Sequence, residues 1–352
     1  MDIKEEIKEK YGFEGDFIPF GNGHINDTYK CGGFVVQKIN ENVFKDPEKL
    51  MENVITVTGH IRKVLEKIGA DPDKGTLTVV NTLEGKPYCR LSDGSFFRVT
   101  RFIENTVSYD EVTPELLYKA AYGFGTFQTM LSDLDGRALH ETIKDFHNTP
   151  ARYRALSEAV RADKCGRVAN IKKELEYLES VKDEYSVVTD LLESGRLPTR
   201  VTHNDTKINN VLFDKDSGEF VAVVDLDTVM PGSLLYDYGD AVRFAVNGAA
   251  EDEPDLSRVC ILYDNFEAFT RGFLEAMGKS IDPLEKELLV FSAKLLTLEL
   301  AIRFLTDYIE GDTYFKTSRP GHNLDRARCQ IRFAQLIEEN KEKLNNTVYG
   351  NN

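Results

Sequence analysis

The chain has 352 residues, a length sufficient for two domains, and its 41% hydrophobic and 29% charged residues are typical of globular proteins. Lysine and arginine total 44 against 59 aspartate and glutamate residues, so the formal net charge is −15. Because nucleic acids and anionic membranes recruit clustered cations, this balance argues against both as partners, but it permits an anionic ligand held with a metal ion.

Cysteine usage and the apolar segments indicate the compartment. The five cysteines are scattered, odd in number and without a C-x-x-C pair, which favours reduced thiols over disulfides or a zinc site. Residues 1–6 contain no apolar signal core. The most apolar long stretch, residues 288–309, is interrupted by four charged side chains and therefore predicts a buried helix rather than a membrane span. We expect a cytoplasmic enzyme.

The first third of the chain is rich in strand signals. Residues 34–39 are β-prone and follow two glycines, and residues 76–80 form a second strand candidate. A turn separates residues 88–91 from 96–100, which predicts a β-hairpin. One helix is expected at 47–68, because its apolar residues recur at spacings of three and four.

The remainder of the chain is mainly helical. Residues 114–131 have helical apolar spacing after the capping pair Thr113-Pro114. A β-rich island occupies 210–227. Further helices are expected at 170–194, 254–277, 283–309 and 323–345. The sequence therefore predicts an α+β fold with a small β-rich N-terminal lobe, residues 1–105, and a larger mainly helical lobe, residues 106–352, with a ligand cleft between them.

The most informative segment is 201–213, in which two apolar strands flank a polar loop. The loop contains Asp205, Lys207 and Asn210, and the next strand ends at Asp225. Phosphoryl transfer needs a carboxylate to deprotonate the acceptor hydroxyl, oxygen ligands for Mg²⁺ and a cation to offset charge. Asp205 suits the first role, Asn210 and Asp225 the second, and Lys207 the third.

The spacing His203, Asp205, Asn210 and then Asp225 matches the catalytic loop and metal-binding aspartate of kinases. It resembles the aminoglycoside phosphotransferase and choline kinase group, and this resemblance implies a two-lobed protein-kinase-like fold that uses ATP and Mg²⁺. Single Asp, Asn and Lys residues in a turn are usually turn formers, but the joint pattern is far more specific. A non-catalytic nucleotide-binding protein is the alternative outside enzymes.

A nucleotide-covering loop is expected before the strand at 34–39. Gly21 and Gly23 permit close approach of the backbone to phosphates, although Asn26 occupies the third glycine position of a full G-x-G-x-x-G motif. No Walker A pattern occurs. The hinge between the lobes is expected near residues 101–105.

Two charged residues are candidates for the ion pair that kinases place beside the nucleotide phosphates. Lys38 lies in the strand and is the natural contact to the α- and β-phosphates. Glu52, on the following helix, is the best candidate for its partner, with Glu48 second. The alternatives are an outward-facing strand lysine and a solvated helix glutamate.

Four blocks carry a closer resemblance: residues 21–26, 203–210, 225–232 and 237–244. They are similar to those of bacterial N-acetylhexosamine 1-kinases, and the similarity extends over about residues 15–340. It implies transfer of phosphate from ATP to the anomeric 1-hydroxyl of N-acetylglucosamine or N-acetylgalactosamine. Asn204 departs from the Gly of many relatives, without an evident chemical cost.

A neutral amido sugar needs polar partners and an apolar wall for its acetyl group. Arg303 is a candidate for sugar hydroxyls, or it pairs with Glu299 one turn earlier. His24 and Lys207 are candidates for contact with the sugar or the γ-phosphate. Phe244 is the candidate wall, with core packing as the alternative.

Three further features bear on the site. Asp237 is expected to hold the catalytic loop rather than react, and His147 is a further candidate for the sugar site, with a surface loop as the preferred interpretation. Other acceptors of the same fold are choline or ethanolamine, homoserine and aminoglycosides, and a cationic acceptor would need an anionic or aromatic cage. Residues 251–253 are acidic, but they are read more simply as a solvated loop.

Overall fold

The computed structural model describes residues 2–21 and 25–350. Its N-terminal part is an antiparallel sheet in which β5 (Cys89–Arg90) pairs with β6 (Phe96–Arg101). The remaining strands run in the order β1 (Ile18–Pro19), β2 (Asp27–Cys31), β3 (Phe34–Lys38), β6 and β4 (Val79–Val80). The strand at 34–39 and the hairpin of 88–91 with 96–100 are thereby confirmed.

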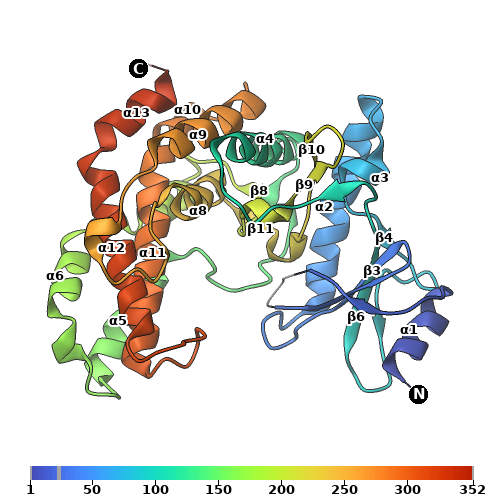
Figure 1. The fold of residues 1–352 in the computed structure, drawn as a ribbon, viewed down its shortest axis with the longest axis horizontal. Coiled ribbons are helices and arrows are strands. Elements are labelled where there is room, and N and C mark those ends of the chain that lie inside the picture. Colours follow the sequence, from blue (N-terminus) through green and yellow to red (C-terminus); the bar gives the residue numbers. More distant parts are fainter. Residues whose placement is uncertain (1, 22–24, 351–352) are drawn as a thin grey trace.

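Two helices cover opposite faces of this sheet (Figure 1). On one face, α1 (Ile3–Tyr11) packs Ile7 and Tyr11 against Val36 and Val99. On the other face, apolar residues of α2 (Pro47–Lys67) join Ile39 and Phe96 in the main core. Successive strand residues point to opposite faces, so these two clusters fix which side chains of β3 and β6 turn toward the rest of the molecule. The short α3 (Pro72–Gly75) follows α2.

The C-terminal part is mainly helical and is centred on α11 (Leu289–Glu310), which contacts α5, α8 and α12. The helices around it are α4 (Pro114–Met130), α5 (Thr149–Ala162), α6 (Lys172–Ser180), α7 (Val187–Glu193), α8 (Leu234–Val246), α9 (Tyr263–Met277), α10 (Pro283–Glu287), α12 (His322–Glu339) and α13 (Lys341–Tyr349). In Figure 1 these helices lie opposite the N-terminal sheet, so the α+β class with a β-rich first part and a helical second part is confirmed.

Two small sheets carry the expected polar loop. One contains β10 (Phe220–Val223), β9 (Val211–Asp214) and β7 (Thr106–Val107), and the other contains β11 (Met230–Gly232) and β8 (Arg200–Thr202). The island at 210–227 is therefore the β9–β10 hairpin. The loop between β8 and β9 ends in a 3₁₀ turn, Ile208–Asn210, and a second 3₁₀ turn, Leu226–Thr228, follows β10.

Some helix boundaries differ from the expected ones. The region 170–194 is broken into α6 and α7, and the helix expected from 254 begins only at Tyr263. After its cap at Ser233 the chain enters α8, whose first half contains residues 237–240. Gly239 permits this helix to approach α11, because a Cβ there would lie 2.6 Å from the main-chain oxygen of Ser292.

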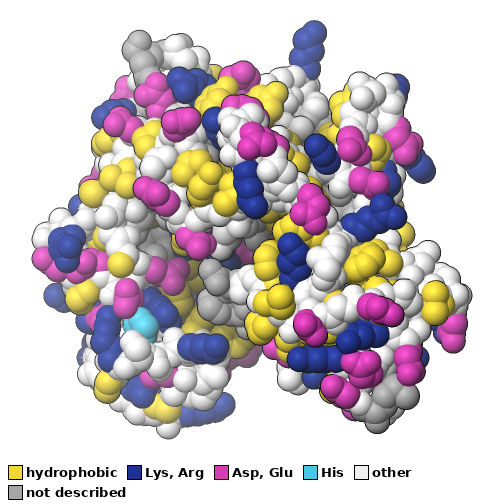
Figure 2. All heavy atoms as spheres, turned by 45° about the vertical axis from the view of Figure 1, so that its right-hand side comes forward, with side chains coloured by type: hydrophobic (Ala, Val, Ile, Leu, Met, Phe, Trp, Pro, Cys, Tyr) yellow, Lys and Arg dark blue, Asp and Glu magenta, His cyan; other side chains and the backbone are white. Residues whose placement is uncertain are grey.

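The surface carries charges of both signs. Figure 2 shows acidic and basic side chains interspersed on one face, without a continuous basic stripe. In the part of the chain that the structure describes, no helix combines the length and apolarity needed to cross a membrane.

Candidate active site

The loop between β8 and β9 is held by one buried carboxylate, that of Asp237 in the first turn of α8. It accepts hydrogen bonds from the main-chain amides of His203 (2.9 Å) and Asn204 (2.7 Å) and from Nε2 of Gln128 (2.7 Å). Burial raises the pKa of Asp237, while His203 and these hydrogen bonds act to lower it. The expectation that Asp237 holds the loop is confirmed.

The conformation of Asn204 explains the residue type at this position. Its φ is 64°, in the left-handed region that Gly adopts freely and Asn better than most other residues. Its side-chain amide donates to the main-chain oxygens of Thr228 (2.8 Å) and Thr202 (3.3 Å). Asn therefore replaces Gly here while tying the loop to the segment after β10.

His203 positions the loop from inside the core. Its ring is fully buried, packs edge-on against Phe124 and Phe127, and places Nε2 2.9 Å from the main-chain oxygen of Val224. Nδ1 accepts from the amide of Asp205 at 3.3 Å. The ring thus links the residue before Asp225 to the backbone of Asp205.

The three predicted loop residues come together. Lys207 Nζ lies 2.7 Å from Oδ1 of Asp205, and Asn210 Nδ2 donates to the main-chain oxygen of Asp205 (2.8 Å) and to Oδ2 (3.3 Å). Desolvation lowers the pKa of Lys207, but the charges of Asp205 and Asp240 outweigh it and leave that pKa raised. Lys207 therefore stays a cation beside the predicted base.

Asp225 is brought to this loop by the hairpin. Val211 pairs with Val223, and the amide of Val224 donates to the main-chain oxygen of Asn210 at 2.9 Å, so Asn210 and Asp225 lie at the same end of β9 and β10. Asp225 is solvent-exposed and has a left-handed backbone, with φ 58°. Desolvation of its carboxyl group by the surrounding protein, together with the nearby carboxylates of Asp227 and Asp205, raises its pKa to about 6.

This pair of residues fits a magnesium ion. The amide nitrogen of Asn210 is used within the loop, which leaves its oxygen for a cation, and the pKa of Asp225 stays raised although Arg98 and His203 act to lower it. Mg²⁺ commonly binds through one or two such oxygens together with substrate phosphates. Over residues 2–21 and 25–350, no cluster of three or more His, Cys, Asp or Glu side chains forms a metal cage.

Asp227, two residues after Asp225, has different partners from Asp225. Asp227 is buried and forms an ion pair with Arg98, a fully buried residue of β6. Asn26 also donates to its Oδ2. The sequence contained no local signal for Arg98, because its partner is more than a hundred residues away.

The expected pair of Lys38 and Glu52 is not formed. Glu52 Oε2 lies 2.6 Å from Nε2 of His140, and no ion pair joins Glu52 to Lys38 within the described ranges. The position of α2 explains this. The next residue, Asn53, donates to the main-chain oxygens of His140 (2.8 Å) and Val229 (2.9 Å), which holds this part of α2 beside His140. Glu48 is exposed and takes part in none of the ion pairs among described residues.

Lys38 lies on the face of the sheet that α1 covers. Its register partner is Phe97, which packs in the cluster around α1, and it has the same parity as Val36 in that cluster. Of the glycine segment, Gly21 is described and exposed, whereas Gly23 and His24 lie outside the described residues.

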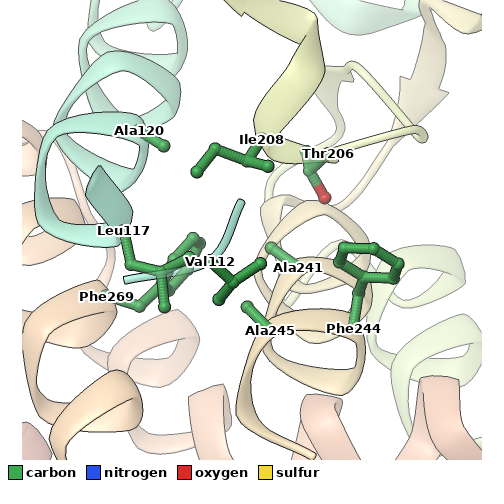
Figure 3. A pocket seen from close by; sticks show the side chains of 9 residues that line it. All are labelled: Val112, Leu117, Ala120, Thr206, Ile208, Ala241, Phe244, Ala245 and Phe269. Atoms are coloured by element: carbon green, nitrogen blue, oxygen red, sulfur yellow. The ribbon is translucent and has the colours of Figure 1, made fainter. Parts of the chain in front are cut away.

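Phe244 lies on α8 beside a small apolar cavity of about 10 Å³, enough for one water-sized group. Its side chain is 45% exposed, so the alternative of core packing does not hold. Figure 3 shows the ring at the rim of the cavity, next to Thr206 of the catalytic loop. The cavity is lined by Val112, Leu117, Ala120, Thr206, Ile208, Ala241, Phe244, Ala245 and Phe269.

Arg303 and Glu299 do not form the ion pair that was the alternative for Arg303. The Glu299 carboxylate accepts from Thr149 Oγ1 (2.7 Å) and contacts His147 Nδ1 (2.8 Å), while the Arg303 guanidinium lies 5.5 Å from the centre of the Phe315 ring. The surface-loop interpretation of His147 is wrong, because its side chain is only 8% exposed. Glu299 on α11 and the ring of Tyr236, 5.0 Å away, cover this side chain.

The chain is similar to known proteins over most of its length. Residues 16–269 match the model of the phosphotransferase enzyme family. Three solved structures are similar over nearly whole chains: an aminoglycoside phosphotransferase from Alicyclobacillus acidocaldarius (15% identity, 98% of this chain and 96% of that one, TM-score 0.62), a microcompartment-associated aminopropanol kinase (14%, 97% and 97%, 0.65), and a spectinomycin phosphotransferase in complex with ADP and spectinomycin (13%, 95% and 97%, 0.58). At these identities the structures establish the fold alone.

Proposed function

Because the chain belongs to the phosphotransferase enzyme family, we propose that it is an ATP-dependent small-molecule kinase whose acceptor is the anomeric 1-hydroxyl of an N-acetylhexosamine. The observation that supports phosphotransfer most strongly is the convergence of Asp205, Lys207, Asn210 and Asp225 on one loop. The product is the sugar 1-phosphate. Residues 1–105 form the nucleotide lobe of this proposal and residues 106–352 the catalytic and acceptor lobe.

Asp205 is the general base in this proposal. Its side chain is 26% exposed, so it is open to an acceptor hydroxyl while its backbone is fixed through His203 and Asn210. The acceptor oxygen attacks the γ-phosphorus in line as its proton passes to a carboxylate oxygen of Asp205, and ADP leaves. Positioning is sufficient for this transfer, and no phosphorylated enzyme is required.

Charge on the moving phosphoryl group is offset from the same loop. Lys207, paired with Asp205 before substrate binds, can turn its ammonium group toward the phosphoryl oxygens, because its side chain is 44% exposed. Mg²⁺ held by Asn210 and Asp225 would supply positive charge that offsets the negative charge of the ATP phosphates.

The surroundings of the loop favour a neutral acceptor over a cationic one. Each acid of the 251–253 segment is paired: Glu251 with Arg243 (3.3 Å), Asp252 with His322 (2.9 Å) and Glu253 with Arg258 (2.9 Å). These carboxylates are therefore unsuited to a cage for choline or an aminoglycoside.

Two features are suited to an amido sugar. The exposed Phe244 ring and the small cavity beside it provide an apolar surface for the methyl of an acetyl group. Arg303, which is not paired with Glu299, retains donors for sugar hydroxyls. His24 stays a candidate for contact with the sugar or the γ-phosphate.

An acceptor panel tests the assignment. ATP consumption is measured with N-acetylglucosamine, N-acetylgalactosamine, glucose, galactose, choline, ethanolamine, homoserine and an aminoglycoside. We expect the highest kcat/KM with an N-acetylhexosamine. Turnover confined to an amine-bearing acceptor would reassign the substrate within the same family, and binding of ATP without transfer to any acceptor would indicate a non-catalytic protein.

A further inference from the structure

The sheet register determines which cation of the N-terminal lobe turns toward the catalytic loop. On β3 and β6, Gln37 is directly opposite Arg98, while Lys38 is opposite Phe97. Phe97 packs in the cluster around α1. Because strand side chains alternate between faces, Gln37 and Arg98 share the face opposite to that of Lys38. Arg98 reaches Asp227, which confirms that its face is the one turned toward the catalytic segment.

Arg98 is held in place on two sides. Its Nε and Nη2 donate to Oε1 of Gln37 at 3.0 and 2.8 Å, and Nη2 also forms the ion pair with Asp227. The side chain is 1% exposed. A guanidinium this deeply buried needs a counter-charge, and Asp227 supplies it.

One nitrogen of the Arg98 guanidinium, Nη1, takes no part in these interactions. Nη1 is buried and has no hydrogen-bond acceptor among the residues that the structure describes. A buried polar nitrogen without a partner is costly, and each such group in a native protein calls for an explanation, for example a catalytic role or contact with an ion. An oxyanion would satisfy this donor.

Asp227 connects Arg98 to the two segments that surround the proposed phosphate site. Asn26, at the end of the glycine segment, donates to Oδ2 of Asp227, and its own Oδ1 accepts from the amide of Asn40 at 2.8 Å. Asp225, the proposed metal ligand, precedes Asp227 by two residues. Through Asp227, Arg98 is therefore joined to Asn26 of the glycine segment and to the segment that carries the proposed metal ligand.

We propose that Arg98, rather than Lys38, is the cation that the N-terminal lobe presents to the nucleotide phosphates, with Gln37 and Asp227 as its positioning residues. This inference rests on the proposed kinase function. Kinases commonly use a strand lysine paired with a helix glutamate for this purpose. Here an arginine from a neighbouring strand and an aspartate from the catalytic segment provide the same two charges, and a guanidinium suits a phosphate well because its donors form a planar fork.

Equilibrium binding tests the inference without an acceptor. The affinities of adenosine, ADP and ATP, with excess Mg²⁺, are measured by calorimetry for the native protein and for Arg98→Met, Lys38→Met and Arg62→Met. Arg62 is the matched control, because it pairs with Asp73 at 2.9 Å between α2 and α3, away from Asp227. We expect Arg98→Met to weaken ATP binding about 10- to 100-fold and adenosine binding by less than about twofold. Both other variants are expected to stay within about twofold of the native protein.

The comparison across the nucleotide series separates a phosphate contact from a structural role. Equal losses for adenosine and ATP would mean that Arg98 only supports the sheet, and this would overturn the inference. Native affinity in Arg98→Met, or a selective loss of ATP binding in Lys38→Met, would also overturn it. If Arg98→Met does not fold, Arg98→Lys serves instead and is expected to lose several-fold in ATP affinity alone. A native protein that binds no nucleotide would refute the kinase function itself.

Discussion

Replacing Asp205 by Asn removes the proposed base with little disturbance of the loop. Asn210 donates to the main-chain oxygen of Asp205 at 2.8 Å, and this bond does not depend on the side chain. The amide of residue 205 also keeps its bond to His203. The ion pair with Lys207 and the ability to accept a proton are lost, and the long contact from Nδ2 of Asn210 (3.3 Å) no longer meets a charged carboxylate.

The magnitudes follow from this division. Lys207 is 44% exposed, so losing its ion pair is expected to cost at most about 1 kcal/mol in the free energy of unfolding. General-base catalysis contributes about 10²- to 10⁴-fold in rate, and kcat is expected to fall by that factor. The affinity for MgATP is expected to change by less than about threefold, because Asn210 and Asp225 remain in place.

The assay compares acceptor-dependent ADP release, ATP affinity and urea unfolding in Asp205→Asn and in a matched control, Asp133→Asn. Asp133 is 79% exposed and contacts His60 on the surface. The control is expected to match the native protein in all three measurements. A kcat for Asp205→Asn above about a tenth of the native value would refute the role of Asp205 as base.

Three further changes probe the loop, the metal segment and α2. In Asp237→Asn, a buried side-chain NH₂ group faces the main-chain amides of His203 and Asn204, which are also donors. The free energy of unfolding is expected to fall by about 1–3 kcal/mol, and kcat is expected to fall as well. Unchanged urea unfolding would contradict this. The raised pKa of Asp225, about 6, means that the folded state holds this proton more tightly than the unfolded state, so its contribution to stability falls as pH rises from about 4 through 6. In metal-free buffer, Asp225→Asn should therefore raise Tm more at pH 8 than at pH 5, and an equal effect at both pH values would oppose that cause. Glu52→Gln is expected to keep ATP affinity within about twofold, because Glu52 contacts His140 and not Lys38. A loss of ATP affinity of tenfold or more in titration calorimetry would instead support a functional Lys38–Glu52 pair.

The arrangement of the loop between β8 and β9 was predictable because its information is local. His203, Asp205, Asn210 and Asp225 lie on one strand–loop–hairpin unit, and the hairpin register brings the distant aspartate back to the asparagine. The spacing of the sequence therefore already contains the geometry. The left-handed backbone at Asn204 had a signal as well, since Gly and Asn are the residues that adopt it readily.

Which face of the N-terminal sheet each strand side chain points to was not predictable in the same way. Residues 34–36 are all apolar, so their pattern does not distinguish the two faces of β3, and Lys38 was assigned from its position in the strand alone. The structure resolves the parity through the α1 cluster. Arg98 was missed because its carboxylate partner lies far along the chain, in the second 3₁₀ turn.

The burial of His147 was not predictable for the same reason. Its neighbours in the sequence are polar and precede a proline, which is typical of a surface loop. Its burial comes from Glu299, 152 residues later, and from the Tyr236 ring 5.0 Å away. Contacts between distant parts of the chain bury this side chain, and no local pattern contains them.

The central claim is transfer of phosphate to the anomeric oxygen of an N-acetylhexosamine. The most direct measurement is phosphorus NMR of the product after incubation with ATP, Mg²⁺ and N-acetylglucosamine or N-acetylgalactosamine, with Asp205→Asn in parallel. The proposed function predicts a phosphate signal coupled to the anomeric proton of the sugar, and none with the variant. A 6-phosphate, or the release of inorganic phosphate alone, would contradict it.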